Sequence, residues 1–308
     1  MDATMTVSKF KKVFSGDFTG SFTSQVAVTG GGGGGIESPY GLTEAELSDA
    51  DLVYAWRAQE ELIGLAFSAA QDDGPAAASG ALTSGERVVS MKDASRRGWP
   101  VNASLYSATP IWETGAGSNF TQALRFNPGA AGSGTERLAT VGSQGAEGIE
   151  YLAPQTAAAP FTMVVRVALH TSPFTTVQGV MSTQDFSGGG FVINCGGSEG
   201  DLAFFFHGGS ISTTVSVDWS DFTVAEAITF AVTSDGTTAS AFRNTDFSTA
   251  ETTDAIVTRS ANQKPLNFGG RAGQQGGDMS LLGVQFWSRE LSQAELERAD
   301  TWIQDAQP

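Results

Sequence analysis

The chain has few cysteines, histidines and cationic side chains, and each shortage excludes a class of protein. One cysteine among 308 residues cannot form an intramolecular disulfide framework or a cysteine-based zinc cluster. Two histidines leave little room for a histidine-rich metal site. The 17 Lys and Arg against 33 Asp and Glu give a net charge of -16, so we expect no binding to nucleic acid or to an anionic membrane.

Long apolar runs are also missing. No stretch reaches the roughly 20 apolar residues that a transmembrane helix needs. Residues 1–12 contain three lysines, but the apolar run of about 7–15 residues that a secretory signal peptide requires does not follow them. We therefore expect a protein that is made in the cytoplasm and either stays there or leaves by assembly into a larger particle.

Glycine and phenylalanine are abundant instead, with 38 and 20 residues respectively. Hydrophobic residues make up 40% of the chain, which is too high a share for a disordered protein. The length is sufficient to bury a large core. These features predict an acidic, glycine-rich globular protein.

Six consecutive glycines, Gly30–Gly35, divide the chain. Because residues without Cβ hold no regular element by themselves, we expect an N-terminal arm with a flexible joint over residues 1–35 and a globular domain over residues 36–308. Residues 1–43 carry no net charge, so the whole net charge of -16 lies in the remainder of the chain.

Large apolar side chains recur in the arm at four-residue intervals, namely Phe10, Phe14, Phe18, Phe22 and Val26. The surrounding Gly, Ser and Thr disfavour a stable helix, so we expect these side chains to bind a partner and order the arm.

The globular domain shows two capping boxes and, between them, a hydrophobic period of two. Thr43 with Glu46, and Ser292 with Glu295, predict the starts of two short helices. Alternation predicts strands at 161–169, 228–232 and 281–286, and turn residues separate further predicted strands at 52–56, 122–126, 177–183, 190–195, 201–207, 212–217, 238–243, 255–260 and 266–269. Many short strands with little helix indicate an all-β, two-sheet antiparallel sandwich.

Several segments resemble the LamG-like, concanavalin A-like jelly rolls of lectins and glucanases. Residues 278–296, DMSLLGVQFWSRELSQAEL, are similar to the family's closing strand and its R-x-L-S-x-x-E helix. Residues 228–243 are similar to the preceding hairpin. Segments at 52–56, 89–93, 110–112 and 123–126 are similar to the family's opening, in which the first and the last of these segments are strands. The resemblance covers about residues 43–305. It implies a jelly-roll sandwich, with Trp287 closing one end and the helix after Ser292 packing Leu296 and Ile303 across a sheet edge.

The sequence carries no recognisable catalytic motif, so we expect no enzymatic activity. Glucanases with this fold place alternate carboxylates of an E-x-D-x-x-E strand in one cleft, and the nearest cluster here, Glu199-Gly200-Asp201, belongs to a turn. The G-x-S-x-G match at 196–200 lies between two strands, where a β-turn is expected rather than a nucleophile elbow. His170 and His207 are interpreted as polar residues at strand ends, and Cys195 as a buried free thiol.

Calcium and glycans are the two ligands that the fold favours. Aspartates at predicted turns could contribute to a Ca²⁺ site, although Asp is also common in turns for structural reasons: Asp185, Asp201, Asp235 and Asp278. Tryptophans in irregular segments could stack on sugar rings or could instead anchor loops on the core: Trp99, Trp112 and Trp219. A calcium ion is therefore an option, and no other cofactor is expected.

Together these features predict a virion structural protein, such as a bacteriophage head fibre, decoration protein or tail fibre. The arm would bind other virion proteins, the jelly roll would be displayed and could bind a cell-surface polysaccharide, and the assembly would be a homo-oligomer. The alternatives are a free carbohydrate-binding protein and a polysaccharide-degrading enzyme of the same superfamily.

Overall fold

The computed structural model describes the chain in segments, which are residues 49, 51–57, 62–64, 84–92, 100–102, 109–115, 117–136, 138–140, 159–173, 176–183, 190–196, 200–207, 212–244, 246–256, 266–270 and 276–304. The chain divides into two units, Met1–Gly35 and Ile36–Pro308, and all the described residues belong to the second. The predicted arm, the glycine joint and the helix predicted after Thr43 lie outside the described residues.

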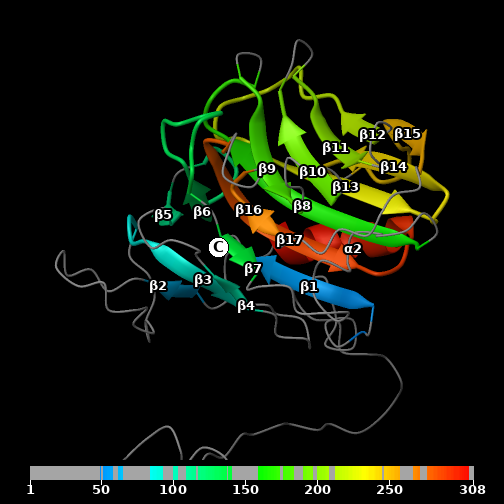
Figure 1. Cartoon of the computed structure of the whole chain (residues 1–308), viewed down its shortest axis with the longest axis horizontal. Coiled ribbons are helices and arrows are strands. Elements are labelled where there is room, and N and C mark those ends of the chain that lie inside the picture. The colour runs from blue at the N-terminus through cyan, green and yellow to red at the C-terminus, as the bar shows by residue number, and fades with distance from the viewer. Residues whose placement is uncertain are drawn as a thin grey trace, which may run out of the picture. The chain divides into compact units, whose positions relative to one another are not determined.

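Two antiparallel sheets form the described part of the second unit, which confirms the predicted fold class (Figure 1). The first sheet has eight strands. Its order is β15 (Thr252–Ala255), β14 (Thr238–Arg243), β13 (Ala227–Ser234), β8 (Phe161–Leu169), β17 (Met279–Trp287), β6 (Gln122–Phe126) and β5 (Ile111–Thr114), and β1 (Leu52–Arg57) pairs with β17 beside β6.

The second sheet has nine strands, several of them only two or three residues long. Its order is β12 (Ser212–Val217), β11 (Leu202–His207), β10 (Gly190–Cys195), β9 (Gln178–Ser182), β16 (Asn267–Phe268), β7 (Leu138–Thr140), β4 (Pro100–Asn102), β3 (Val88–Lys92) and β2 (Leu62–Gly64).

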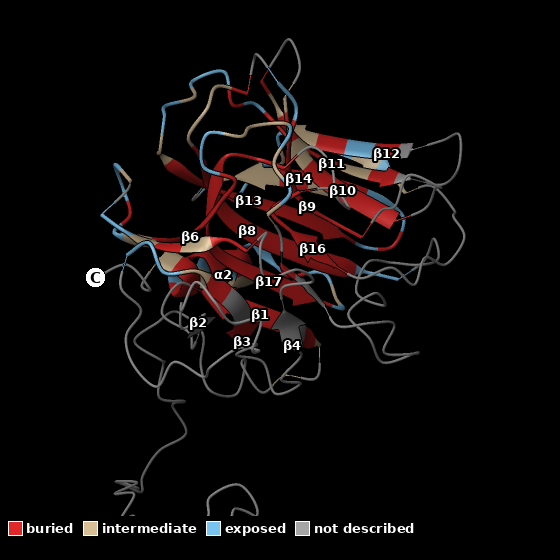
Figure 2. Cartoon of the chain, turned by 60° about the vertical axis from the view of Figure 1, so that its left-hand side comes forward, coloured by how far each residue is buried: buried red, intermediate tan, exposed pale blue. Residues whose placement is uncertain are grey.

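The main core lies between the sheets, and β8 shows how the sequence pattern builds it. Phe161, Met163 and the alternate residues after them belong to the core between the sheets. The intervening residues face the opposite side of the first sheet, where Val164 joins a second apolar cluster and Arg166 donates a hydrogen bond to Thr229. All nine residues of β8 are therefore buried. Figure 2 shows the central strands of both sheets mostly in the buried colour.

The outer face of the first sheet is covered by the helix α2 (Gln293–Gln304). The predicted capping box is present, because Glu295 Oε2 accepts hydrogen bonds from the backbone N–H and hydroxyl of Ser292, each at 2.8 Å. The helix packs on β8 and β17, the two central strands, so the expectation that it crosses a sheet edge was wrong. Gly283 in β17 permits this close approach, since a Cβ there would lie 2.5 Å from Ile303 Cγ2.

At one side of the sandwich, side chains of one sheet accept hydrogen bonds from the edge strand of the other. Thr214 and Ser216 belong to β12, the last strand of the second sheet, and their N–H groups donate to Asp254 Oδ2 and Thr252 Oγ1 at 2.8 and 2.7 Å. Both acceptors belong to β15, the last strand of the first sheet. An unpaired edge is a template for aggregation, so this arrangement protects the edge of β12.

Most predicted strands are confirmed, and the errors involve short or weakly patterned segments. The end strand of the first sheet is β15 at Thr252–Ala255, so the strand predicted at 255–260 starts too late, and positions 257–260 of that prediction lie outside the described residues. The short strands β2, β3, β4, β5 and β7 were not predicted as strands, because segments of three to five residues show at most a weak period of two. No helix in the described segments is long and apolar enough to cross a membrane.

Candidate functional site

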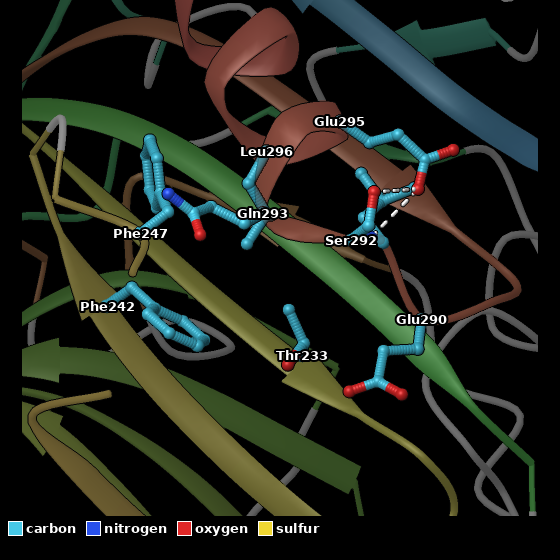
Figure 3. Close-up of a pocket in the computed structure, with 9 residues that line it drawn as sticks. Thr233, Phe242, Phe247, Glu290, Ser292, Gln293, Glu295 and Leu296 are labelled. Atoms are coloured by element: carbon cyan, nitrogen blue, oxygen red, sulfur yellow. Dashed lines mark hydrogen bonds between the residues drawn. The ribbon is translucent and has the colours of Figure 1, made fainter. Parts of the chain in front are cut away.

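A surface pocket of about 460 Å³ lies where β13, β14 and the start of α2 meet (Figure 3). Its described lining residues come from three parts of the sequence. They are Thr233 from β13, Phe242 from β14, Phe247 from the loop that follows, and Glu290, Leu291, Ser292, Gln293, Glu295 and Leu296 from the turn after β17 and the first turn of α2. This volume falls within the range of about 300–1,000 Å³ that is typical of small-molecule sites.

Two phenylalanines form one side of the pocket. The rings of Phe242 and Phe247 have centroids 6.4 Å apart and planes inclined at 57°. Phe247 is buried in the apolar cluster beneath α2, whereas Phe242 is half-buried and packs against that cluster. Figure 3 shows both rings on the side of the pocket opposite Ser292 and Glu295. The pocket therefore has an apolar wall supported by the helix–sheet interface.

Carboxylates and other hydrogen-bonding groups form the other side. Glu295 is held by Ser292 and by Arg289, whose Nη2 lies 2.8 Å from Glu295 Oε1. Burial alone would raise the pKa of Glu295, but the hydrogen bonds from Arg289 and Ser292 outweigh it and lower this pKa to about 2. Glu290 is exposed, and its carboxylate has no hydrogen-bond partner among the described residues. Gln293 is exposed and donates to Glu297.

A second polar cluster lies inside the protein, near the ends of β6, β8 and β17. Asp278 Oδ1 accepts hydrogen bonds from Arg125 Nε at 3.0 Å and Nη2 at 2.5 Å. Asp278 Oδ2 accepts from the Gly129 N–H at 3.1 Å and from the Thr171 hydroxyl at 3.0 Å. Arg125 Nη1 also contacts Glu113 Oε2 at 3.3 Å. Both oxygens of Asp278 are thus bound by protein donors, and the cluster ties loops to strands.

The same region contains a Ser–His pair that the sequence did not reveal. His170 Nε2 lies 2.7 Å from Ser280 Oγ. Burial, together with the nearby Arg125 charge, lowers the pKa of His170 to about 4, although Asp278 acts in the opposite direction. Such a pair can form a nucleophile and its base. Ser280 is completely buried, however, so a substrate carbon cannot reach its hydroxyl.

The structure places two of the three candidate glycan-binding tryptophans in the core. Trp112 and Trp219 are 6% and 2% exposed and belong to the cluster between the sheets. Trp219 also packs edge-on against Phe222, with ring centroids 5.6 Å apart. Neither indole presents a face on which a sugar could stack, so these two residues act as core anchors. Trp99 lies outside the described residues.

The three candidate calcium ligands that the structure describes, Asp201, Asp235 and Asp278, do not form a metal site. Asp278 is buried in the cluster described above, and Asp201 accepts a hydrogen bond from Ser216 at 3.1 Å. Asp235 holds the β13–β14 turn by accepting from the N–H groups of Thr237 and Thr238, and these bonds together with that from the Thr237 hydroxyl lower the pKa of Asp235. The described part of the chain contains no group of three or more His, Cys, Asp or Glu side chains placed to hold a metal ion. Asp185 and the five arm residues Phe10, Phe14, Phe18, Phe22 and Val26 lie outside the described residues.

Cys195 is a buried free thiol, as the sequence predicts. Its Sγ donates to the carbonyl of Gly200 at 3.4 Å, and burial raises the pKa of the thiol. A nucleophilic cysteine needs a lowered pKa and access to solvent, and Cys195 has neither.

Comparison with solved structures supports a sandwich fold shared with toxin binding domains. The binding domain of botulinum neurotoxin serotype G has a TM-score of 0.53 at 12% identity, over 82% of this chain and 51% of that chain. The binding domain of serotype D has a TM-score of 0.51 at 7% identity, over 80% and 50%. The binding domain of Paraclostridial Mosquitocidal Protein 1 has a TM-score of 0.50 at 12% identity, over 80% and 51%.

The present chain thus spans about half the length of those solved chains. No protein-family model matches the sequence, and no curated protein matches it. At these identities the likeness concerns the fold, so the chain has the β-sandwich architecture found in these binding domains.

Proposed function

We propose that residues 36–308 form a non-enzymatic, lectin-like binding domain whose ligand is a glycan. The observation that carries this proposal is the pocket between β13, β14 and α2, in which an aromatic wall faces carboxylate, amide and hydroxyl groups. Sugar rings have apolar faces and polar edges, and such a combination of surfaces complements both. The sandwich fold shared with binding domains agrees with this reading.

An enzymatic reading finds no comparable support. The Ser280–His170 pair resembles a catalytic dyad in distance, but the serine hydroxyl has no access to solvent. Of the nearby carboxylates, that of Asp278 accepts a hydrogen bond from Arg125, and that of Glu136 accepts one from the backbone N–H of Asn127. We therefore assign these groups to stability.

The test is a glycan array with the full chain, with and without Ca²⁺, followed by the same array with Phe242→Ala. We expect binding to a subset of glycans that is independent of Ca²⁺ and is lost when the half-buried ring is removed. An array without any binding would refute the lectin proposal. Release of reducing sugar from a polysaccharide would instead favour a degrading enzyme.

We also propose that residues 1–35 anchor the domain on a virion, as a head fibre, decoration protein or tail fibre does, in an oligomer. The support is compositional: a neutral arm with phenylalanines at regular spacing, and a run of glycines before the acidic domain. Deleting residues 1–35 should remove the protein from purified particles, as measured by mass spectrometry. Recovery of the truncated chain on particles would refute the anchoring role.

A further inference from the structure

The charges around the pocket narrow the class of ligand. Among the described lining residues there are two glutamates and no lysine, arginine or histidine. Arg289 is close to one of them, but its Nη2 is paired with Glu295 at 2.8 Å, and Asp49 Oδ2 lies 3.7 Å from the same nitrogen. Because Arg289 balances the charge of Glu295, an anionic group in the pocket would meet the unpaired carboxylate of Glu290 and no cation among the described lining residues.

Glu290 is the group that is available to a ligand. Its side chain is exposed, whereas Glu295 is already bound by the helix cap and by Arg289. An exposed carboxylate attracts a ligand cation weakly in water and more strongly where the pocket excludes solvent. The pocket thus offers one carboxylate that can accept hydrogen bonds from an ammonium group.

The aromatic wall favours the same kind of ligand. Phe242 is half-buried and lines the pocket, so part of its ring is accessible from it. The face of an aromatic ring attracts a cation, and an apolar sugar face can stack on the same ring. The combination of carboxylate and ring therefore complements a ligand that has both an ammonium group and a flat apolar face.

We propose that this pocket binds an amino sugar through an ammonium–Glu290 contact and stacking on Phe242. This inference rests on the proposed lectin function and specifies its ligand. The net charge of -16 acts in the same direction, because a strongly acidic protein attracts cationic ligands and repels anionic ones.

The test compares two probes with the same sugar skeleton, the disaccharide of glucosamine, whose amines are protonated, and its N-acetylated counterpart, which is uncharged, by calorimetry at mildly acidic pH with the full chain. We expect the charged probe to bind at least tenfold more tightly, and its affinity to fall as salt rises. Glu290→Gln should lower this affinity about tenfold and leave that for the N-acetylated probe nearly unchanged. Phe242→Leu, which keeps an apolar side chain but removes the ring, should weaken both.

Glu226→Gln is the matched control. It removes the same charge, but Glu226 precedes β13 at the end opposite Thr233, roughly 20 Å away at about 3.3 Å per residue. Its affinity for the charged probe should equal that of the unmodified protein. An equal loss in Glu226→Gln and Glu290→Gln would show that net charge alone attracts the ligand, which would overturn the assignment of Glu290.

The remaining outcomes separate this inference from the lectin proposal. If the two probes bind with equal affinity and Phe242→Leu abolishes the binding of both, the amino-sugar inference is overturned and the glycan site stays in place. If other glycans bind and neither Glu290→Gln nor Phe242→Leu changes their affinity, the assignment of the glycan site to this pocket is overturned. Absence of binding to any glycan would overturn the lectin proposal as well.

Discussion

The buried pair of Asp278 and Arg125 yields the most quantitative prediction. The side chains are 5% and 11% exposed, and two hydrogen bonds join them at 3.0 and 2.5 Å. Asp278→Ala would leave the guanidinium with Glu113, at 3.3 Å, as its remaining described partner, and would remove the acceptor of the Gly129 N–H. Breaking a buried pair by removing one member typically costs about 3–5 kcal/mol.

We therefore expect Asp278→Ala to lower the free energy of unfolding by about 3–5 kcal/mol. For a domain of this size each kcal/mol corresponds to roughly 2–4 °C in Tm, so Tm should fall by roughly 6–20 °C. Urea unfolding followed by tryptophan fluorescence measures the first quantity, and thermal unfolding followed by circular dichroism measures the second. In a double mutant with Arg125→Met the loss should be smaller than the sum of the two single losses, because each single variant already removes the Asp278–Arg125 interaction.

A surface pair of the same residue types provides the control. Asp221 and Arg243 lie 2.9 Å apart, but the aspartate side chain is 70% exposed. Asp221→Ala should cost less than about 1 kcal/mol, because water screens exposed pairs. Equal costs for the two alanine variants would refute the argument from burial. A fall in the Tm of the unmodified protein on addition of EDTA, matching that of Asp278→Ala, would show instead that Asp278 binds a metal ion.

Three further predictions concern the helix interface and the response to pH. Gly283→Ala should destabilise the domain by about 1–3 kcal/mol in urea unfolding, because the new Cβ would meet Ile303. Ile303→Ala should then cost less in the Gly283→Ala background than in the unmodified chain. Additive losses of the two variants would contradict the close contact. Because burial lowers the pKa of His170 from 6.5 to about 4, the free energy of unfolding should decrease as the pH falls from about 6.5 to 4. His170→Gln should flatten this part of the pH profile. An unchanged slope in that variant would refute the role of His170. Because the pKa of Glu295 lies at about 2 rather than 4.5, the contribution of its carboxylate to stability should be lost as the pH falls from about 4.5 to 2. Glu295→Gln should reduce the slope of stability against pH in that window. A slope equal to that of the unmodified protein would contradict the carboxylate's role in the cap.

Local patterns in the sequence predicted the parts of the fold that depend on neighbouring residues. Alternation along residues 161–169 predicted β8 with its correct bounds, since a period of two depends only on the strand itself. The capping box at Ser292 and Glu295 predicted the start of α2 for the same reason, because its hydrogen bonds span three residues. The hairpin implied by the resemblance of residues 228–243 is also present, as the antiparallel pair β13–β14.

Contacts between distant residues were not predictable in this way. His170 and Ser280 are 110 positions apart and meet because β8 pairs with β17, a neighbour that no local pattern identifies. The burial of Trp112 and Trp219 depends likewise on which sheet covers them. Each tryptophan lies beside a proline or an aspartate, a setting compatible with either a loop surface or a core anchor.

The sequence by itself thus determined the fold class, the bounds of most strands and the helix cap, because each depends on spacing along a few consecutive residues. The tertiary structure alone decided the strand order, the position of α2 over the centre of the first sheet, and the candidate site. Thr233, Phe242 and Glu290 line one pocket only because β13, β14 and the turn after β17 meet there. The pairing of strands far apart in the chain is a property of the whole folded domain, so it leaves no signature in any single segment.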